Sequence, residues 1–275
     1  LIIELPFLYS TSSAEYFAYA AINLLQQTNV VDCVCFGSET NNLQELQLLS
    51  EILLTELPKY KEYHKNHLDQ GLSFAKSRQL ALDDFLTSCN LSINTDQINL
   101  SNNILAIEYL KALKKLESNI LPMSIKRISN SYNSTSLNSE LVSATALRNV
   151  IINNCRKDIP ENTLPLLYKF MPFESVEILS QEILSGKAPV FLDKYTDIII
   201  SPLRKNSLNY LCDINYISEG LENRLKAHIQ SYKPISDLVE SMATKRYPKT
   251  RILRAILSSL LGITKEQFQS FYSND

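Results

Sequence analysis

Two hydroxyl side chains and an arginine stand close together in Ser143-Ala-Thr-Ala-Leu-Arg148, where the pattern predicts the start of a helix. A serine or threonine at a helix N-terminus leaves free backbone N–H groups at the positive end of the helix dipole. Such an end binds anions, and an arginine one turn further on adds a bidentate donor for phosphate. Ser143, Thr145 and Arg148 therefore form a candidate phosphate site, although an ordinary helix cap has the same pattern.

Three more candidate residues stand at the ends of predicted elements. Gly37 directly follows a predicted strand, where the missing side chain lets a base or ribose approach the backbone; an ordinary tight turn explains it equally well. Asn102 is expected to cap a helix and can also bond to a ribose or base. Arg127 ends another predicted strand and either faces phosphates or is, like its neighbour Lys126, an ordinary solvated cation.

The elements that position these residues alternate between apolar runs and helical periodicity. Strand, helix and strand within the first forty residues predict a βαβ unit with a parallel sheet, and ligands gather at the carboxyl ends of such strands. The expected strands are Leu1–Leu5, Val30–Phe36 and Met123–Ile128; the expected helices are 14–27, 43–56, 60–68, 71–89, 102–116 and one over the SATALR segment, with loops at Pro6–Ser12 and Ser129–Ser139.

The most basic segment is Thr244–Arg254, which contains no acidic residue. Clustered cations with one aromatic side chain are typical of RNA binding, through phosphate contacts and base stacking. A solubilising helix face is the alternative, but it would normally mix charge signs. Ser218–Arg224 is expected to begin a salt-bridged helix that braces this segment. The candidate RNA-binding residues are Lys245, Arg246, Tyr247, Lys249, Arg251 and Arg254.

Composition limits the remaining possibilities. A net charge of −2 means that a nucleic-acid partner needs a local basic patch, and 45% apolar residues suffice for a sizeable core. The cysteines are scattered; Cys33 and Cys35 are predicted to be buried strand thiols in a reducing cytoplasm. His64 and His67 are expected on a solvated helix face, and no metal site is predicted. No apolar run approaches the length of a membrane span.

Two domains are expected, with a boundary near 155–165. Residues 1–158 form an α/β domain with a parallel sheet, and 159–275 form a mostly helical domain punctuated by prolines. The chain begins at Leu1 inside an apolar run, which is unusual for a natural N-terminus. We therefore expect that an upstream part of the sheet is missing and that an apolar face is exposed.

Taken together, these segments resemble the bacterial tRNA-methionine cytidine acetate ligase family, nucleotidyltransferase-like enzymes of the HIGH superfamily. The resemblance covers essentially the whole chain, in the family's order. The matching segments are Ile3-Glu-Leu-Pro-Phe7, Ser13-Ala-Glu15, Cys35-Phe-Gly-Ser-Glu39, Gly71-Leu-Ser-Phe-Ala-Lys-Ser-Arg78, Asn102–Lys111, Ile125-Lys-Arg127, Ser143–Arg148, Ser218–Arg224 and Thr244-Lys-Arg-Tyr247.

The resemblance implies a Rossmann-like nucleotidyltransferase domain followed by a helical tRNA-binding domain. It also implies ATP-dependent N4-acetylation of the wobble cytidine of elongator tRNA-Met in the cytoplasm, with Mg²⁺ accompanying ATP. Acetate and ATP would form acetyl-adenylate, and the cytidine amine would then attack the acyl carbon. By analogy Gly37 and Asn102 contact the nucleoside, Arg127, Ser143, Thr145 and Arg148 hold phosphates, and the basic segment holds tRNA.

The chain departs from the family in one respect. The His-x-Gly-His loop that follows the family's first strand is absent, so no catalytic residue is assigned. We expect these 275 residues to be a fragment that is catalytically inactive alone. Two alternatives remain: an RNA-binding protein without catalysis, and a small-molecule adenylyltransferase, which would not need the basic segment. The sequence does not indicate an oligomeric state.

Overall fold

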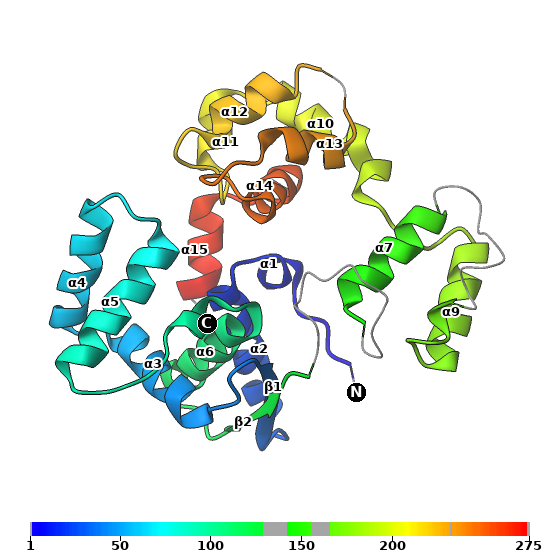
Figure 1. The fold of residues 1–275 in the computed structure, drawn as a ribbon. Coiled ribbons are helices and arrows are strands. Elements are labelled where there is room, and N and C mark those ends of the chain that lie inside the picture. The colour runs from blue at the N-terminus through cyan, green and yellow to red at the C-terminus, as the bar shows by residue number, and fades with distance from the viewer. Residues whose placement is uncertain (1, 129–141, 156–165, 232, 274–275) are drawn as a thin grey trace. The chain divides into compact units, whose positions relative to one another are not determined.

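The computed structural model describes residues 2–128, 142–155, 166–231 and 233–273. Contacts divide the chain into two units, Leu1–Tyr132 and Asn133–Asp275 (Figure 1). The expected functional boundary at 158/159 and the expected loop at Ser129–Ser139 fall largely or wholly outside the described residues, so both stay predictions.

The first unit is built around a two-stranded parallel sheet. Strand β1 (Cys33–Ser38) pairs with β2 (Leu121–Lys126), and the register places Gly37 opposite Ile125. The parallel arrangement was predicted, but β1 begins three residues later than expected and includes Gly37. The helices of this unit are α1 (Phe7–Ser10), α2 (Ala14–Gln27), α3 (Leu43–Thr55), α4 (Pro58–Asp69), α5 (Phe74–Ser88) and α6 (Ser101–Lys115), with a 3₁₀ turn η1 (Asp96–Asn99).

Local sequence signals fix several of these helix ends. Asn42 caps α3 by accepting a hydrogen bond from the backbone N–H of Glu45 at 3.3 Å. Ser73 caps α5 in the same way, from the N–H of Lys76 at 3.4 Å. Pro58 occupies the first position of α4, where a missing N–H costs nothing. The expected helices therefore form with ends shifted by only a few residues.

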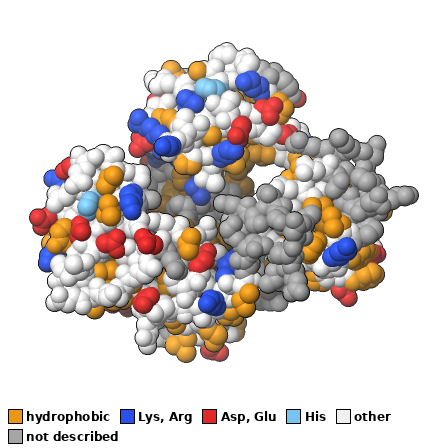
Figure 2. Space-filling view, viewed as in Figure 1, with side chains coloured by type: hydrophobic (Ala, Val, Ile, Leu, Met, Phe, Trp, Pro, Cys, Tyr) orange, Lys and Arg blue, Asp and Glu red, His pale blue; other side chains and the backbone are white. Residues whose placement is uncertain are grey.

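One face of the sheet packs against helices and the other is exposed. Phe36 is buried and stacks on Tyr109 of α6, with ring centroids 5.8 Å apart. Cys33 and Cys35, predicted to be buried, are exposed on the opposite face, because successive strand residues alternate between faces. The neighbouring side chains of β2 on that face, Leu121, Met123 and Ile125, are 68%, 52% and 58% exposed, and orange side chains gather over this part of the molecule in Figure 2. The expectation of an exposed apolar face is met in the described residues.

The predicted strand Leu1–Leu5 is not formed in its described part. Residues 2–6 have no regular structure, and the expected loop after them contains the short helix α1. A strand requires a neighbouring strand to accept and donate its backbone hydrogen bonds. Here Ile2 is 98% and Ile3 42% exposed, and the described residues of this run pair with no strand.

The second unit is helical in its described residues, as expected. Its core includes Ile199, Leu211, Leu225 and Ile256, all fully buried. None of the helices in the described part of the chain is long and apolar enough to cross a membrane. The helices are α7 (Ala144–Cys155), α9 (Phe173–Leu184), α10 (Thr196–Lys205), α11 (Leu208–Asp213), α12 (Leu221–His228), α13 (Ile235–Met242), α14 (Lys249–Leu261) and α15 (Lys265–Ser273), with a 3₁₀ turn η2 (Leu192–Tyr195).

Candidate functional site

Three of the six residues predicted to bind nucleotide meet at the carboxyl end of β1. Arg127 follows β2, and its backbone N–H donates to the carbonyl of Ser38 at 3.0 Å. Its guanidinium Nη1 donates to Oδ1 of Asn102 at 3.3 Å. A Cβ built on Gly37 would lie 3.7 Å from Cγ of Arg127, so the arginine stem lies next to the position that a side chain would take there. Segments far apart in sequence are thus joined in one cluster.

Glu39 was not predicted, yet its carboxylate organises this cluster. Oε1 accepts from the backbone N–H of Asn102 at 3.2 Å and from its side-chain amide at 2.7 Å. Oε2 accepts from the backbone N–H of Asn103 at 2.8 Å. Helix α6 therefore begins at Ser101 and is capped by an acid from another element, rather than by Asn102 as expected. The negative charge of the carboxylate is also stabilised by the positive end of the helix dipole.

Asn103, also missed, fastens the two elements together. Its side-chain oxygen accepts from Ser38 Oγ at 2.8 Å and from the backbone N–H of Glu39 at 2.9 Å. Ser38 and Asn103 are both buried, so these hydrogen bonds are shielded from water. Glu39 and Asn103 could have been recognised as candidates from the polar Gly-Ser-Glu that ends an apolar strand, together with the consecutive asparagines at a helix start.

A pocket of about 310 Å³ borders this cluster within the first unit. Gly37 and Asn102 line it together with side chains of α2 and α6, including Leu25 and Tyr109. Burial raises the pKa of the Tyr109 phenol, so this ring is neutral at physiological pH. The lining is an apolar wall with polar groups at one end, which suits a flat ring carrying polar substituents.

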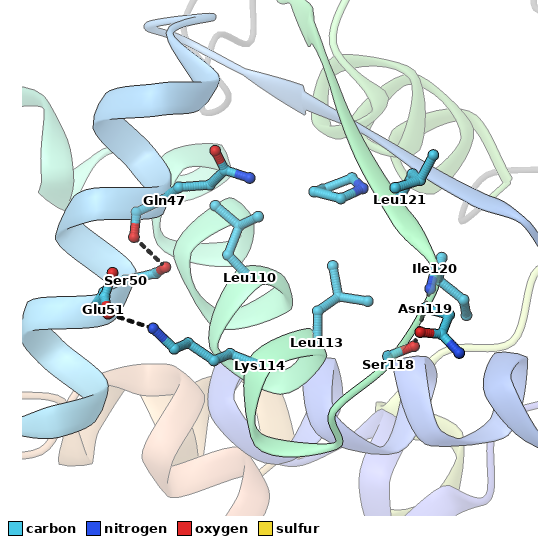
Figure 3. Close-up of a pocket in the computed structure, with 11 residues that line it drawn as sticks. Gln47, Ser50, Glu51, Leu110, Leu113, Lys114, Ser118, Asn119, Ile120 and Leu121 are labelled. Carbon is cyan, nitrogen blue, oxygen red and sulfur yellow. Dashed lines mark hydrogen bonds and ion pairs between the residues drawn. The ribbon is translucent and has the colours of Figure 1, made fainter.

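A larger pocket of about 590 Å³ lies at the opposite end of the strands (Figure 3). It lies between α3, α6 and the start of β2, and Lys114 of α6 points toward Glu51 of α3, with which it forms an ion pair. The two charges cancel, and none of the predicted site residues lines this pocket. The carboxyl end of β1 is therefore the better candidate for a ligand site.

The other three predicted phosphate ligands lie at the start of α7 in the second unit. Ser143 is the predicted N-cap: its Oγ accepts from the backbone N–H of Ala146 at 3.0 Å. Thr145 lies in the first turn, half-buried, and Arg148 is exposed on the same helix. The predicted helix start is confirmed, and a role in phosphate binding stays a prediction.

The aromatic residue of the basic segment, which begins before α14, is buried. Tyr247 is only 9% exposed, and its hydroxyl donates to the backbone carbonyl of Glu219. The ring lies near the guanidinium groups of Arg246 and Arg251, whose carbons are 5.7 and 5.5 Å from its centroid. The ring is therefore enclosed beside these two cations, and base stacking by Tyr247 stays a prediction.

Acidic residues accompany this segment although its sequence contains none. Arg251 Nη1 lies 2.9 Å from Glu219 Oε2, and Arg246 Nε lies 3.7 Å from the same oxygen. Lys249 forms an ion pair with Glu240 of α13. Figure 2 accordingly shows blue and red side chains interspersed over the part that holds α10 to α14. The expected bracing by the Ser218–Arg224 segment is confirmed.

The histidines of α4 are not on a solvated face, contrary to expectation. His64 stacks on Tyr60 and meets Phe74 edge-on, with centroids 5.9 and 5.1 Å apart. His67 Nε2 lies 2.7 Å from Asp84 Oδ2 of α5. Both rings face α5 because the two helices pack as a hairpin. Within the described residues no group of three or more histidine, cysteine, aspartate or glutamate side chains is placed to hold a metal ion.

Comparison with known proteins agrees with this architecture. The HIGH nucleotidyl transferase family matches residues 1–275. A tRNA(Met) cytidine acetate ligase of Acetivibrio thermocellus is 39% identical over 97% of this chain and 63% of its own length. One from Clostridium kluyveri is 40% identical over 95% of this chain and 63% of its own length. The chain therefore spans slightly less than two thirds of these relatives.

Two solved structures are also similar. Thermotoga maritima TmcAL in an apo form superposes with a TM-score of 0.87 at 32% identity, covering 97% of this chain and 62% of that one. The same protein bound with alpha-thio ATP gives 0.84 at 31% identity, covering 97% and 61%. The fold is thus a nucleotidyltransferase-like one. With a family match over its whole length, the chain belongs to the HIGH nucleotidyl transferase family.

Proposed function

We propose that this chain takes part in the ATP-dependent N4-acetylation of the wobble cytidine of elongator tRNA-Met, supplying ATP-binding and tRNA-binding residues. The observation that carries the proposal is the cluster of Gly37, Asn102 and Arg127 at the carboxyl end of β1. Relatives named tRNA(Met) cytidine acetate ligase support it, as does the related structure bound with alpha-thio ATP.

The residues of the first unit fit a nucleotide. The exposed backbone at Gly37 and the amide of Asn102 would contact the nucleoside, and the Arg127 guanidinium would face the phosphates. Asn102 Oδ1 already accepts from Arg127, so the arginine is oriented before ATP arrives. In the second unit, Ser143, Thr145 and Arg148 on α7 would hold further phosphate oxygens. Mg²⁺ would enter with the triphosphate and neutralise part of its charge.

The chemistry follows from the need to activate a poor acyl donor. A carboxylate oxygen of acetate attacks the α-phosphorus of ATP, and pyrophosphate leaves. The exocyclic amine of cytidine then attacks the acyl carbon; the C–O bond to AMP breaks and the amine loses a proton. Cations close to the phosphates stabilise the charge that develops in the first step. We place this reaction in the cytoplasm, with acetate as the acid.

The basic segment around α14 is the proposed tRNA contact. Lys245, Arg246 and Arg251 would bind the backbone phosphates, with Lys249 and Arg254 extending the surface. Tyr247 would act through the arginines above its ring. Binding of this kind weakens steeply with salt, because each phosphate contact releases counterions.

Two binding measurements on this chain separate the proposal from its alternatives. Calorimetry with ATP and a filter-binding titration with an elongator tRNA-Met transcript should both show saturable binding. Binding of tRNA without ATP would favour an RNA-binding protein, and binding of ATP without tRNA a small-molecule adenylyltransferase. Because the sequence contains no His-x-Gly-His, we expect no acetate-dependent ATP–pyrophosphate exchange by these residues alone.

A further inference from the structure

One carboxylate oxygen joins two arginines of the proposed tRNA surface. Oε2 of Glu219 lies 2.9 Å from Arg251 Nη1 and 3.7 Å from Arg246 Nε. Arg251 Nη2 also donates to Ser218 Oγ at 2.7 Å. The hydrogen bond from Arg251, with smaller contributions from its charge and from Arg246, holds the pKa of Glu219 below its ordinary value. The carboxylate is therefore charged and shared between two guanidinium groups.

The backbone holds Glu219 in this place. Its φ is 60°, in the left-handed region that a residue with a side chain rarely adopts. Gly220 follows with φ 90°, and a Cβ there would lie 3.4 Å from the Tyr247 hydroxyl. That hydroxyl donates to the Glu219 carbonyl. The buried tyrosine thus fixes both the acid and the arginines around one point.

A carboxylate and a phosphodiester offer arginine the same kind of acceptor, two oxygens that match its planar donors. The Glu219 side chain is 53% exposed, so its ion pairs are in contact with water. Exposed pairs contribute little to stability, and replacing one partner by an equivalent anion therefore costs little. A phosphate arriving from solvent meets two arginines that are already held around one anionic oxygen.

We propose that Glu219 occupies the position of an RNA backbone phosphate and is displaced by that phosphate when tRNA binds. The inference rests on the proposed tRNA-binding role of the second unit. The carboxylate keeps Arg246 and Arg251 oriented in the free protein and lowers the affinity for RNA that does not place a phosphate between them. Glu219 then braces the two arginines in the free protein and, by yielding its place only to a suitably positioned phosphate, also determines specificity.

The first test compares Glu219→Gln with Glu222→Gln. Glu222 lies three residues on, at the start of α12, and accepts a hydrogen bond from its neighbour Asn223. Both changes remove one negative charge, and the backbone bond from Tyr247 is unaffected by either. In filter binding with the tRNA-Met transcript, Glu219→Gln should bind about threefold to fivefold more tightly than the wild-type chain. Glu222→Gln should change the affinity by less than about twofold. Equal effects of the two would overturn the proposal.

A double-mutant cycle with Arg251→Ala gives the sign of the coupling. If phosphate replaces Glu219, the Arg251→Ala change costs more affinity in the Glu219→Gln background than in the wild type. In the Glu219→Gln background, Arg251 does not have to give up an ion pair with the carboxylate when it binds phosphate. If Glu219 is only a brace, Glu219→Gln weakens binding and Arg251→Ala then costs less. The thermal unfolding midpoint of each variant establishes that it is folded.

Inorganic tripolyphosphate keeps this test independent of the tRNA proposal. In NMR titrations that follow the Arg251 Nε–Hε signal, Glu219→Gln should be half-saturated at a concentration severalfold lower than the wild-type chain. Such a result without tRNA binding would support the anion site while contradicting the tRNA role. No difference between the two proteins would contradict the displacement itself.

Discussion

Asn102 donates twice to one oxygen of Glu39, from its backbone N–H at 3.2 Å and from its side-chain amide at 2.7 Å. The remaining side-chain oxygen of Asn102 accepts from Arg127. The amide therefore links an acid that caps α6 to the cation proposed to face phosphates. The orientation of Arg127 depends on this arrangement.

Replacing Glu39 by glutamine should loosen the start of α6. The carboxylate of Glu39 accepts hydrogen bonds with both oxygens, whereas the amide of glutamine has only one oxygen. The substitution also removes the negative charge that interacts favourably with the helix dipole. We expect the free energy of unfolding to fall by about 1–2 kcal/mol, measured by urea denaturation. Glu15→Gln, in the exposed first turn of α2, is the control for the dipole effect alone. Equal losses in both would show that the hydrogen bonds to Asn102 and Asn103 contribute nothing.

Arg127→Ala should lower ATP affinity by about tenfold or more, because a charge-assisted hydrogen bond to phosphate is lost. Lys126→Ala removes the same charge from the exposed residue before it and should change affinity by less than about threefold. Calorimetry on the two variants measures both values. Matching losses would mean that ATP responds to net charge and not to the oriented guanidinium.

His64 should make stability depend on pH in mildly acidic solution. Burial lowers its pKa from 6.5, and its buried Nε2 has no hydrogen-bond partner in the described structure. Between the folded pKa and 6.5 the unfolded chain binds more protons, so stability is complete above pH 6.5 and is lost as the pH falls. In denaturation at several pH values, His64→Phe should reduce this slope. A slope unchanged in His64→Phe would contradict the assignment.

Tyr247→Phe tests whether the hydroxyl fixes the loop at Glu219. The ring stays and one buried hydrogen bond is lost, so the free energy of unfolding should fall by about 1 kcal/mol. Tyr195→Phe, at an exposed tyrosine, should change it by less than about 0.5 kcal/mol. Thermal denaturation of both variants measures the difference. A neutral Tyr247→Phe would mean that the Glu219 carbonyl is equally well satisfied by water.

Local patterns predicted most helices, because caps and apolar periodicity act over a few residues. The alternation of strand and helix predicted that the sheet is parallel, but not which strands pair. The strand expected at Leu1–Leu5 failed for a non-local reason, since pairing depends on a neighbouring strand that a run of apolar letters does not specify. The prediction that Cys33 and Cys35 are buried was wrong for a similar reason. Alternation along the strand places both on one face, but tertiary packing decides which face is covered.

The candidate sites show the same division. Gly37, Asn102 and Arg127 could be predicted because strand ends in a parallel sheet converge, and the structure brings them together. Glu39 could not be recognised as the cap of a helix more than sixty residues away. Tyr247 looked like a stacking residue because cations surround it in sequence, whereas its enclosure comes from the loop at Glu219.

The most direct test of the central claim is an ATP titration of the chain followed by backbone NMR. The claim is that nucleotide binds at the carboxyl end of β1. It predicts that the amide signals of Gly37, Asn102 and Arg127 shift saturably, while those of Gln47 and Asn119, at the pocket in Figure 3, do not. Shifts confined to Gln47 and Asn119, or no saturable shift in the first group, would contradict it.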